Sequence, residues 1–365
     1  MLYEPRQPLR IEELELGSPR TGEARVRVLA AGVCHSDYHY MQGDLEVPLP
    51  VVLGHEGAGI VEEVGPGVTS IEPGDHVVLL WRSSCGHCAY CNTGRPALCP
   101  RGLQLRTTGR LLDGTARFSR GGAEVGHFLG VSCFAESTVC MEQSLLKIDR
   151  DVPMAIAAVA GCAVMTGVGA ATNSARVEPG SSALVIGAGG VGLCTVMGAQ
   201  LCGAAQIIAA DVNPAKLELA RSFGATDVID ASSQDVVAEA RRLSGGGVDY
   251  AFEAIGRPDT LAAAVRALRA AGTAVAIGIT PASARVEISP LDLVLQEKTL
   301  KGSVYGSTRP YADFPRLFEL YRRGRLPLDR LLTREYRLDQ INEAYEALLA
   351  GEVARSVIAF EKTTA

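Results

Sequence analysis

The pattern of hydrophobic and polar positions differs between two parts of the chain. Up to about residue 150, short runs alternate apolar with polar residues, as in EARVRVLAAGV at 23–33 and GHEGAGIVEEVGPGV at 54–68. Turn formers such as GPG and EPGD separate these runs. Alternation with a period of two is typical of half-buried strands, and Gly–Pro clusters are typical of the turns between them. This part is predicted to be a compact, mostly β domain.

From about residue 164 the pattern changes to short, fully hydrophobic segments separated by Ala-rich segments. The predicted strands are SALVIGAG, AAQIIAADV, TDVIDA, VDYAFEAIG and GTAVAIGI, and the helical segments include NPAKLELARSFG and PDTLAAAVRALRAAG. From about residue 305, YADFPRLFELYRRG and LDQINEAYEALLAG predict two further helices, and SVIAF predicts a closing strand. Strands that alternate with helices imply an α/β fold with a parallel, doubly wound sheet.

Length, charge and the N-terminus narrow the class of protein. A chain of 365 residues is long enough for two domains, each with its own core. The formal net charge of −6 argues against a nucleic-acid partner, because such a surface needs a basic excess. The N-terminal MLYEPRQPLRIEELELG lacks the apolar core of a signal peptide, so a cytoplasmic location is expected.

Two uncharged stretches, 152–175 and 181–210, are long enough to be checked as membrane spans. Both are dense in Gly and Ala, and the second is interrupted at GAGG, so buried segments of a globular fold explain them better and no membrane partner is expected. Ten cysteines without a secretory signal favour metal binding or catalysis over a disulfide framework.

The run ALVIGAGGVGLCTVMGAQ carries a candidate dinucleotide site. Gly187, Gly189 and Gly192 have G-x-G-x-x-G spacing directly after a strand, where missing Cβ atoms admit a pyrophosphate at a helix N-terminus. A second strand ends at Asp211, whose carboxylate favours the ribose of NAD and repels the 2′-phosphate of NADP. The alternative to a nucleotide site is a Gly-rich turn that serves only for packing, in an α/β domain that binds no nucleotide. Lys216 is a further candidate contact, although an exposed helix lysine is the commoner explanation.

The segment CGHCAYCNTGRPALC sets four cysteines at C-x2-C-x2-C-x7-C spacing: Cys85, Cys88, Cys91 and Cys99. Four thiolates so close together can close a tetrahedral shell with no open position, which predicts a structural zinc ion. The spacing also permits an iron–sulfur cluster, and zinc is preferred. A nucleic-acid-binding zinc finger is disfavoured, because the segment carries few basic residues and no recognition helix follows.

Six segments together resemble one family. GVCHSDYH, GHEGAGIVEEVG, the four-cysteine lobe, GCAVMTGVGAA, GAGGVG and FEAIGRPDT occur in the order found in zinc-dependent medium-chain alcohol dehydrogenases, and the similarity continues to GEVARSVIAF. The resemblance implies a catalytic domain with a GroES-like β core in residues 1–163 and 305–365. It implies a Rossmann NAD-binding domain in residues 164–304.

The resemblance also implies a second, catalytic zinc ion. Its ligands would be Cys34, His55 and Cys162, with Glu56 beside it as an occasional or outer ligand. Taken singly, each of these residues is more often part of a core, and nothing in their spacing brings them together. Three protein ligands leave a fourth position for water or substrate, and the resemblance implies hydride transfer from a zinc-bound alkoxide to NAD+.

Further residues take roles from the same resemblance. Ser36 matches the hydroxyl that takes the alcohol proton, His39 matches the outer histidine that releases it to solvent, and Asp37 matches the carboxylate that orients His55. A half-exposed turn histidine is the plainer interpretation of His39. The remaining matches are to cofactor contacts (His35, Gly190, Val191, Ile255, Arg257 and Arg355) and to pocket-lining positions (Trp81, Thr166 and Val304). His35 stands where many members have arginine, and Trp81 could equally be core.

The predicted substrate is a primary alcohol, aromatic or of medium length, because Trp81 offers a wide aromatic wall. The insert RGLQLRTTGRLLDGTARFSRGGAEVGHFLG resembles the dimeric branch, which includes thiol-dependent formaldehyde dehydrogenases, so that activity is the alternative. His39 and the short QGDLEVPLP depart from that class, and Asp44 and Glu46 are its remaining candidate contacts. VAIGITPASARVEISP resembles the family's subunit interface and implies a homodimer. A non-catalytic NAD-binding redox sensor is a third possibility.

Overall fold

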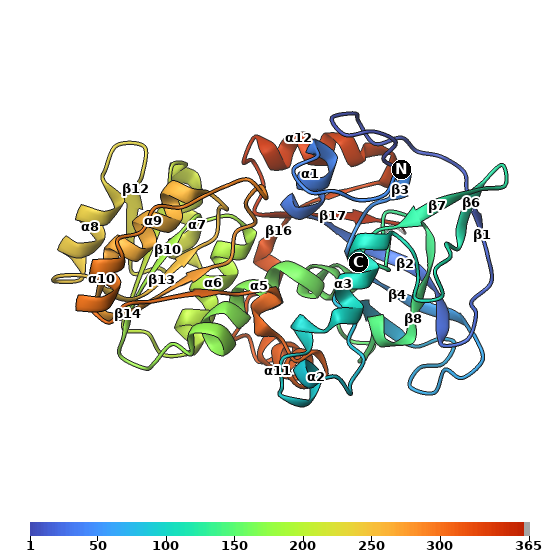
Figure 1. Ribbon diagram of the computed structural model, residues 1–365, viewed down its shortest axis with the longest axis horizontal. Coiled ribbons are helices and arrows are strands. Elements are labelled where there is room, and N and C mark those ends of the chain that lie inside the picture. The colour runs from blue at the N-terminus through green and yellow to red at the C-terminus, as the bar shows by residue number, and fades with distance from the viewer. Residues whose placement is uncertain (361–365) are drawn as a thin grey trace. The chain divides into compact units, whose positions relative to one another are not determined.

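The computed structural model describes residues 1–360, and contacts within the chain divide it into two compact units (Figure 1). Unit 1 comprises Met1–Cys162, Arg309–Gly324 and the chain from Leu328 onward, and unit 2 comprises Ala163–Thr308 and Arg325–Pro327. Each unit has its own sheet and its own buried apolar cluster.

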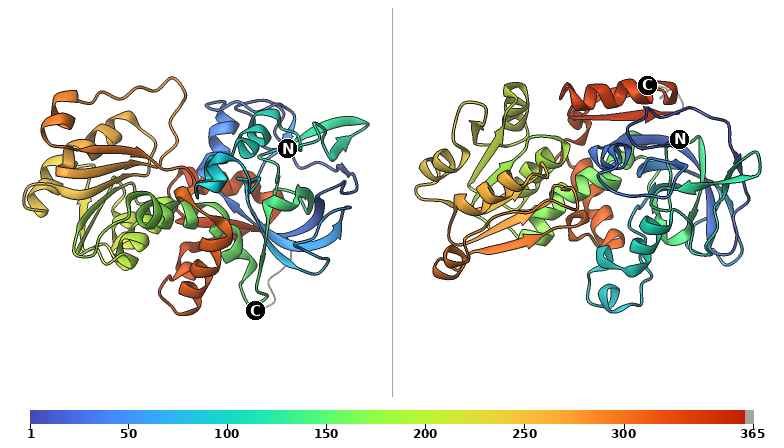
Figure 2. Two further views of the ribbon diagram at one scale, coloured as in Figure 1. Left: turned by 60° about the horizontal axis from the view of Figure 1, so that its bottom comes forward. Right: turned by 45° about the horizontal axis from the view of Figure 1, so that its top comes forward.

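Unit 1 is built on a seven-stranded sheet in the order β16-β17-β2-β4-β5-β9, with β8 paired to β2. Its strands are β2 (Glu23–Val33), β4 (Glu56–Val64), β5 (His76–Leu79), β8 (Ser137–Met141), β9 (Leu145–Ile148), β16 (Leu332–Tyr336) and β17 (Arg355–Ala359). The alternation predicted for 23–33 is thus a strand of the same bounds. In Figure 2 the red β17 lies beside the blue β2, which pair in antiparallel register although they come from opposite ends of the chain.

Smaller elements complete unit 1. A second sheet has the order β1-β6-β7-β3, and helices pack against strands of the seven-stranded sheet. These elements are β1 (Glu15–Leu16), α1 (His35–Gln42), β3 (Val51–Val52), α2 (Ala89–Asn92), η1 (Pro96–Leu98), α3 (Pro100–Thr108), β6 (Phe118–Arg120), β7 (Ala123–His127), η2 (Glu142–Ser144), α4 (Met154–Val159), α11 (Pro310–Arg322), η6 (Leu328–Leu331), η7 (Leu338–Gln340) and α12 (Ile341–Leu349).

Unit 2 is a six-stranded parallel sheet in the order β12-β11-β10-β13-β14-β15. The strands are β10 (Ser182–Ile186), β11 (Gln206–Asp211), β12 (Asp227–Asp230), β13 (Val248–Glu253), β14 (Leu268–Ala276) and β15 (Thr299–Gly302). Chain order reverses between β10 and β13, and ligands of such sheets bind at the carboxyl ends of strands at that point. The predicted doubly wound sheet is confirmed.

Unit 2 also contains helices and short helical turns (Figure 1). They are α5 (Met165–Gly169), η4 (Ala170–Ala175), α6 (Gly190–Leu201), α7 (Pro214–Ser222), α8 (Val236–Leu243), α9 (Pro258–Ala267), α10 (Pro290–Leu295) and η5 (Tyr305–Ser307). The expectation of helix through PDTLAAAVRALRAAG is partly wrong, because α9 ends at Ala267 and Leu268 already pairs with Val248 of β13. Pairing within the sheet here overrides the helix propensity of the segment.

One segment, Met154–Ala175, is helical and apolar enough to cross a membrane by length and composition. In the structure 89% of its most apolar window is buried, as in the core helix of a globular protein. Two of its turns, η3 (Ala160–Val164) and η4, are π-helical. Such turns within a helix occur frequently at functional sites.

A buried charged network anchors the loop between α3 and β6 to β2. Arg117 donates through two nitrogens to the carboxylate of Glu23, and both side chains are about 2% exposed. The backbone N–H of Arg117 donates to Nε2 of His127 at 3.0 Å. His127 is fully buried, and this burial, with the positive charge of Arg117, lowers its pKa to about 3. The imidazole is therefore neutral in the folded protein.

This burial makes stability depend on pH. Unfolding frees His127 to bind a proton below its usual pKa near 6.5, so its contribution falls as pH falls toward 3. Between pH 6.5 and 4.5 the loss is about 2 kcal/mol. We expect His127→Gln, which keeps an acceptor for Arg117, to remove that loss from the free energy of urea-induced unfolding. His87→Gln, at an exposed position, is the control; equal pH slopes for His127→Gln and wild type would contradict the account.

Candidate functional site

Four ligand-type side chains from distant parts of the sequence meet in unit 1. One ligand atom each of Cys34, His55, Glu56 and Cys162 lies within 4.8 Å of the others, and all four residues are buried. Cys34 follows β2, His55 and Glu56 stand at the start of β4, and Cys162 lies in the π-helical turn η3. The structure thus brings together the residues that the resemblance named as a metal site.

Asp37 orients the imidazole of His55. Its Oδ2 lies 2.9 Å from Nδ1 of His55, and its Oδ1 accepts the backbone N–H of Gly54 at 3.1 Å. Both ring nitrogens of His55 are buried, and neither has a partner in strict hydrogen-bond geometry among residues 1–360. A ring nitrogen held against a carboxylate leaves the opposite nitrogen as the metal ligand, as in many zinc sites.

The chemistry of the donor set fits a zinc ion. A hydrogen bond from Cys162 lowers the pKa of Cys34 well below its ordinary value, against the opposing effect of burial. Two sulfurs and one imidazole nitrogen are borderline-soft ligands, which zinc prefers. Three such ligands, with a carboxylate beside them, are the composition of a catalytic site with an open position rather than of a closed structural site.

Glu56 is held beside this cluster by Arg355. The guanidinium of Arg355 donates to Oε2 of Glu56, and both side chains are almost completely buried. Burial raises the pKa of Glu56 to about 8, although the charge of Arg355 opposes the shift. A Cβ on Gly32 would lie 2.0 Å from Oε2, so only glycine admits this carboxylate. Arg355, predicted to contact pyrophosphate, is buried against Glu56 here, and the cofactor role stays a prediction.

The four-cysteine lobe is a second, separate cluster. Cys88 Sγ lies 3.6 Å from Cys91 Sγ and 3.9 Å from Cys99 Sγ, and Cys85 Sγ lies 4.0 Å from Cys91 Sγ. A tetrahedral zinc ion with bonds of about 2.3 Å requires sulfurs about 3.8 Å apart. The backbone N–H of Cys88 points to Cys85 Sγ at 3.3 Å. The geometry therefore fits a closed structural zinc shell.

Two aromatic rings pack against the imidazole of His55. The rings of Trp81 and Phe128 each lie edge-on to it, with centroids 6.0 Å away, and Phe128 in turn contacts Tyr40 at 4.7 Å. The guanidinium of Arg82 lies 5.4 Å from the centre of the Trp81 ring. Trp81 is only half-buried. It is therefore placed beside a predicted metal ligand, on an apolar wall.

Helix α1 carries the residues predicted to move protons and bind cofactor. Ser36 is half-buried in its first turn, while His35 is exposed. The ring of His39 lies 5.4 Å from the ring of His35, and its Nδ1 lies 3.0 Å from Oδ2 of Asp44. Sequence reasoning assigned Asp44 only a loop or substrate contact and missed this pair. The αL glycine after the helix, Gly43, was the available signal.

In unit 2 the glycines of the predicted nucleotide loop have distinct environments. Gly187 has φ +100°, and a Cβ on Gly192 would lie 1.7 Å from the carbonyl oxygen of Gly187, so β10 and α6 approach more closely than a side chain allows. A Cβ on Gly189 would meet no atom within 4 Å. This leaves open space in front of the N-terminus of α6, where a pyrophosphate fits. Gly190 and Val191 form the first turn of that helix.

Asp211 ends β11 and is tied to the same loop. Its Oδ2 accepts the backbone N–H of Ala188 at 2.8 Å, and its Oδ1 accepts the N–H of Asn213 at 3.0 Å. Lys216 is half-buried in the first turn of α7, and the neighbouring Val212 is 65% exposed. A carboxylate therefore stands at the carboxyl end of the second strand, as the sequence predicted.

The loop after β13 is shaped by a residue that sequence reasoning missed. Glu253 is 1% exposed, and its Oε1 accepts from the backbone N–H groups of Ile255 and Gly256 and from the hydroxyl of Thr260. Its position at the carboxyl end of a parallel strand was the only signal. Ile255 is 43% exposed, and Arg257 forms an exposed ion pair with Asp259.

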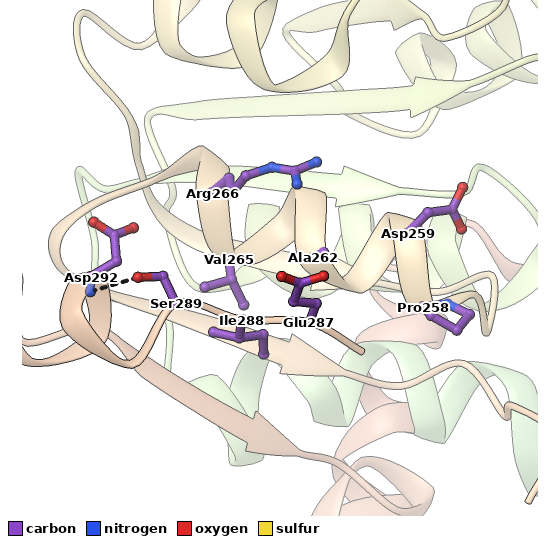
Figure 3. A pocket seen from close by; sticks show the side chains of 9 residues that line it. All are labelled: Pro258, Asp259, Ala262, Val265, Arg266, Glu287, Ile288, Ser289 and Asp292. Carbon is purple, nitrogen blue, oxygen red and sulfur yellow. Dashed lines mark hydrogen bonds between the residues drawn. The ribbon is translucent and has the colours of Figure 1, made fainter. Parts of the chain in front are cut away.

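Two predicted pocket residues, Thr166 and Val304, are half-buried in unit 2. Unit 2 also has a hollow beside α9 (Figure 3), lined by Pro258, Asp259, Ala262, Val265, Arg266, Glu287, Ile288, Ser289 and Asp292. The hydroxyl of Ser289 caps α10 by accepting the N–H of Asp292. None of the predicted site residues lines this hollow, so it gives no support to their roles.

The two clusters predict two zinc ions per chain. Cys34→Ser and Cys91→Ser should each reduce the zinc content from two ions to one, because each removes one ligand of one cluster. The measurement is elemental analysis by mass spectrometry after dialysis. Cys202→Ser, outside both clusters and half-buried, should retain two ions. Iron with visible absorbance that disappears in Cys91→Ser would instead establish an iron–sulfur cluster in the lobe.

Comparisons with known proteins agree with this architecture. Residues 20–150 match the family model of the alcohol dehydrogenase GroES-like domain, and residues 190–323 match that of zinc-binding dehydrogenases. The predicted pairing of a GroES-like domain with a Rossmann domain is therefore confirmed.

Solved structures extend the match over almost the whole chain. An alcohol dehydrogenase zinc-binding domain protein from Burkholderia ambifaria is 38% identical, with TM-score 0.94, over 98% of this chain and 97% of that one. Benzyl alcohol dehydrogenase from Acinetobacter calcoaceticus is also 38% identical, with TM-score 0.91, over 95% and 94%. A chain from Sinorhizobium meliloti 1021, solved bound to NADP, is 27% identical, with TM-score 0.73, over 94% of each. On these grounds the chain belongs to the zinc-binding medium-chain alcohol dehydrogenases, a family of oxidoreductases.

Proposed function

We propose that this protein oxidises primary alcohols, aromatic or of medium length, to aldehydes with NAD+ and a catalytic zinc ion. The observation that carries the proposal is the buried cluster of Cys34, His55 and Cys162, with Glu56 tied back by Arg355. In a purely structural site Glu56 would close the shell as the fourth ligand, whereas here its Oε2 is engaged by Arg355. A non-catalytic NAD-binding sensor would need none of these buried ligands.

The chain's residues divide the chemical work. Cys34, His55 and Cys162 would hold the zinc ion, which would supply a Lewis acid that lowers the pKa of an alcohol. Asp37 fixes the imidazole of His55 through the 2.9 Å contact at Nδ1. The hydroxyl of Ser36 accepts the alcohol proton as it releases its own proton toward His39, and the imidazole of His39 then releases a proton to solvent. These two residues lie on one short helix, α1, three positions apart, and so share a face.

NAD+ is the proposed hydride acceptor. A dinucleotide would bind at the open space in front of Gly189, and Asp211 would bind the ribose hydroxyls. The two residues after Asp211 are Val212 and Asn213, and neither offers a basic side chain to compensate a 2′-phosphate. A carboxylate at this position repels that phosphate. Because one relative was solved bound to NADP, the proposed preference for NAD+ over NADP+ is tested by comparing the two cofactors directly.

The proposed preference for aromatic alcohols depends on Trp81. Its ring lies edge-on to His55 and remains half-buried, which leaves part of an aromatic face available beside the metal ligands. Aromatic surfaces of this kind favour flat, apolar substrates. The similarity to benzyl alcohol dehydrogenase supports the same class of substrate.

We also propose that the protein is a homodimer formed through β15. All four residues of this edge strand are exposed, and among the described residues no strand pairs with its outer side. Val294 and Leu295 of the preceding α10 are each 73% exposed, and Leu291 is 66% exposed. Open strand edges and apolar patches are normally covered. A second copy would pair β15 with itself about a two-fold axis and bury these side chains.

The function is tested by NADH formation with the zinc-loaded protein. Benzyl alcohol and hexanol should be oxidised, and replacing NAD+ by NADP+ should lower kcat/KM about tenfold or more. Chelator treatment and Cys34→Ser should each abolish turnover, while Cys202→Ser should not change it.

The remaining outcomes decide between the alternatives. Turnover of only formaldehyde plus a low-molecular-weight thiol would replace the proposal by the thiol-dependent activity. No turnover of any alcohol or adduct, with zinc and NAD+ both bound, would refute catalysis and favour the sensor.

The dimer predicts a mass in sedimentation equilibrium twice that of the chain at micromolar concentration. Leu295→Asp should shift the equilibrium toward the monomer, because a carboxylate would be buried without a partner. Leu349→Asp, at the end of α12 and 45% exposed, is the matched control and should leave the mass unchanged. A monomeric wild type would contradict the proposed interface.

A further inference from the structure

After helix α1 the chain folds back toward the last turn of that helix. Gly43 follows the helix in the left-handed conformation, with φ 78°, and its N–H donates to the carbonyl of Tyr40. The N–H of Asp44 then donates to the carbonyl of His39 at 2.9 Å. Glycine adopts this conformation without steric cost, and helices commonly end this way. The reversal brings the residue after Gly43 back to the side chain of His39.

The side chains of Asp44 and His39 meet as a result. Oδ2 of Asp44 lies 3.0 Å from Nδ1 of His39, with His39 only 16% exposed and Asp44 39% exposed. An ionised carboxylate can only accept hydrogen bonds, so Nδ1 must carry the proton. The lone pair of the neutral imidazole is then on Nε2. One contact thus selects both the tautomer and the orientation of the ring.

We propose that Asp44 is a positioning residue for His39 and keeps Nε2 unprotonated as the atom that accepts the substrate proton. This inference rests on the proposed dehydrogenase function. A ring free to adopt either tautomer would present an N–H to the incoming proton for part of the time. The ring of His35 also faces His39, with the two centroids 5.4 Å apart, but His35 has no carboxylate oxygen that could accept from Nδ1 of His39.

Glu46 lies in the same segment and can be compared directly with Asp44. Glu46 follows Asp44 by two residues and is exposed, but the structure gives it no contact with His39. Both carboxylates were candidate contacts for a thiol substrate. Only Asp44 is already engaged by a ring within the chain, which favours the positioning role for Asp44 over a contact with substrate.

The test compares Asp44→Asn with Glu46→Gln in the full-length, zinc-loaded protein. Each variant replaces an exposed carboxylate by an amide, so both should fold and retain zinc. An amide can also donate to Nδ1, and this permits the other tautomer. We expect Asp44→Asn to lower kcat for benzyl alcohol about tenfold and to increase the solvent deuterium isotope effect. Glu46→Gln should leave both unchanged, and Asp44→Glu should restore part of the rate.

A second readout reports the tautomer without turnover. The chain has six histidines, and selective nitrogen-15 labelling with His39→Gln for assignment identifies the nitrogens of His39 by NMR. We expect a proton on Nδ1 in the wild type and in Glu46→Gln, and a mixture of tautomers in Asp44→Asn. An active wild type whose tautomer or kcat is unchanged by Asp44→Asn would overturn the inference and leave the proposed function standing. An inactive wild type would instead refute the proposed function.

Discussion

The burial of four ligand-type side chains in one place is the constraint on which the rest of unit 1 depends. Thiols, an imidazole and a carboxylate are expensive to remove from water unless they share a cation or pair with one another. The pairing of strands in the sheet brings these side chains together. Gly32 of β2 stands opposite Glu56 of β4, and Val33 stands opposite Ser356 of β17. The three strands thereby deliver Cys34, Glu56 and Arg355 to the same end of the sheet.

The two clusters of ligands differ in how the chain assembles them. The lobe of Cys85 to Cys99 is local: all its sulfurs come from fifteen consecutive residues, and two are oriented by backbone N–H groups of the same loop. The other cluster requires a completed sheet and a helix before its atoms meet. Local assembly suits a site that stabilises a loop, whereas assembly from several elements suits a site whose surroundings must include substrate and cofactor.

The features that follow from local pattern could be predicted from the sequence. The alternation of 23–33 predicted β2, and the order of strands and helices predicted the parallel sheet with its glycine loop and Asp211. The meeting of Cys34, His55 and Cys162 does not follow from spacing, and only the family resemblance indicated it. Glu253 and the pairs Glu56–Arg355 and His39–Asp44 were missed for the same reason, since each depends on backbone geometry that hydrophobic periodicity does not report. Likewise α9 ends early because Leu268 pairs in the sheet.

The π-helical turn around Cys162 limits which changes of length this segment can accept. A π-turn accommodates one residue more than an α-helical turn. Deleting a single residue from this turn would allow the helix to close to regular α-helical geometry; the flanking turns would keep their orientation, but the residues of Ala160–Val164 would be repositioned. The thiol of Cys162 would then leave the cluster, although the segment would remain just as apolar and just as helical. Insertions and deletions between Met154 and Ala175 should therefore be far less tolerated than substitutions among small apolar residues.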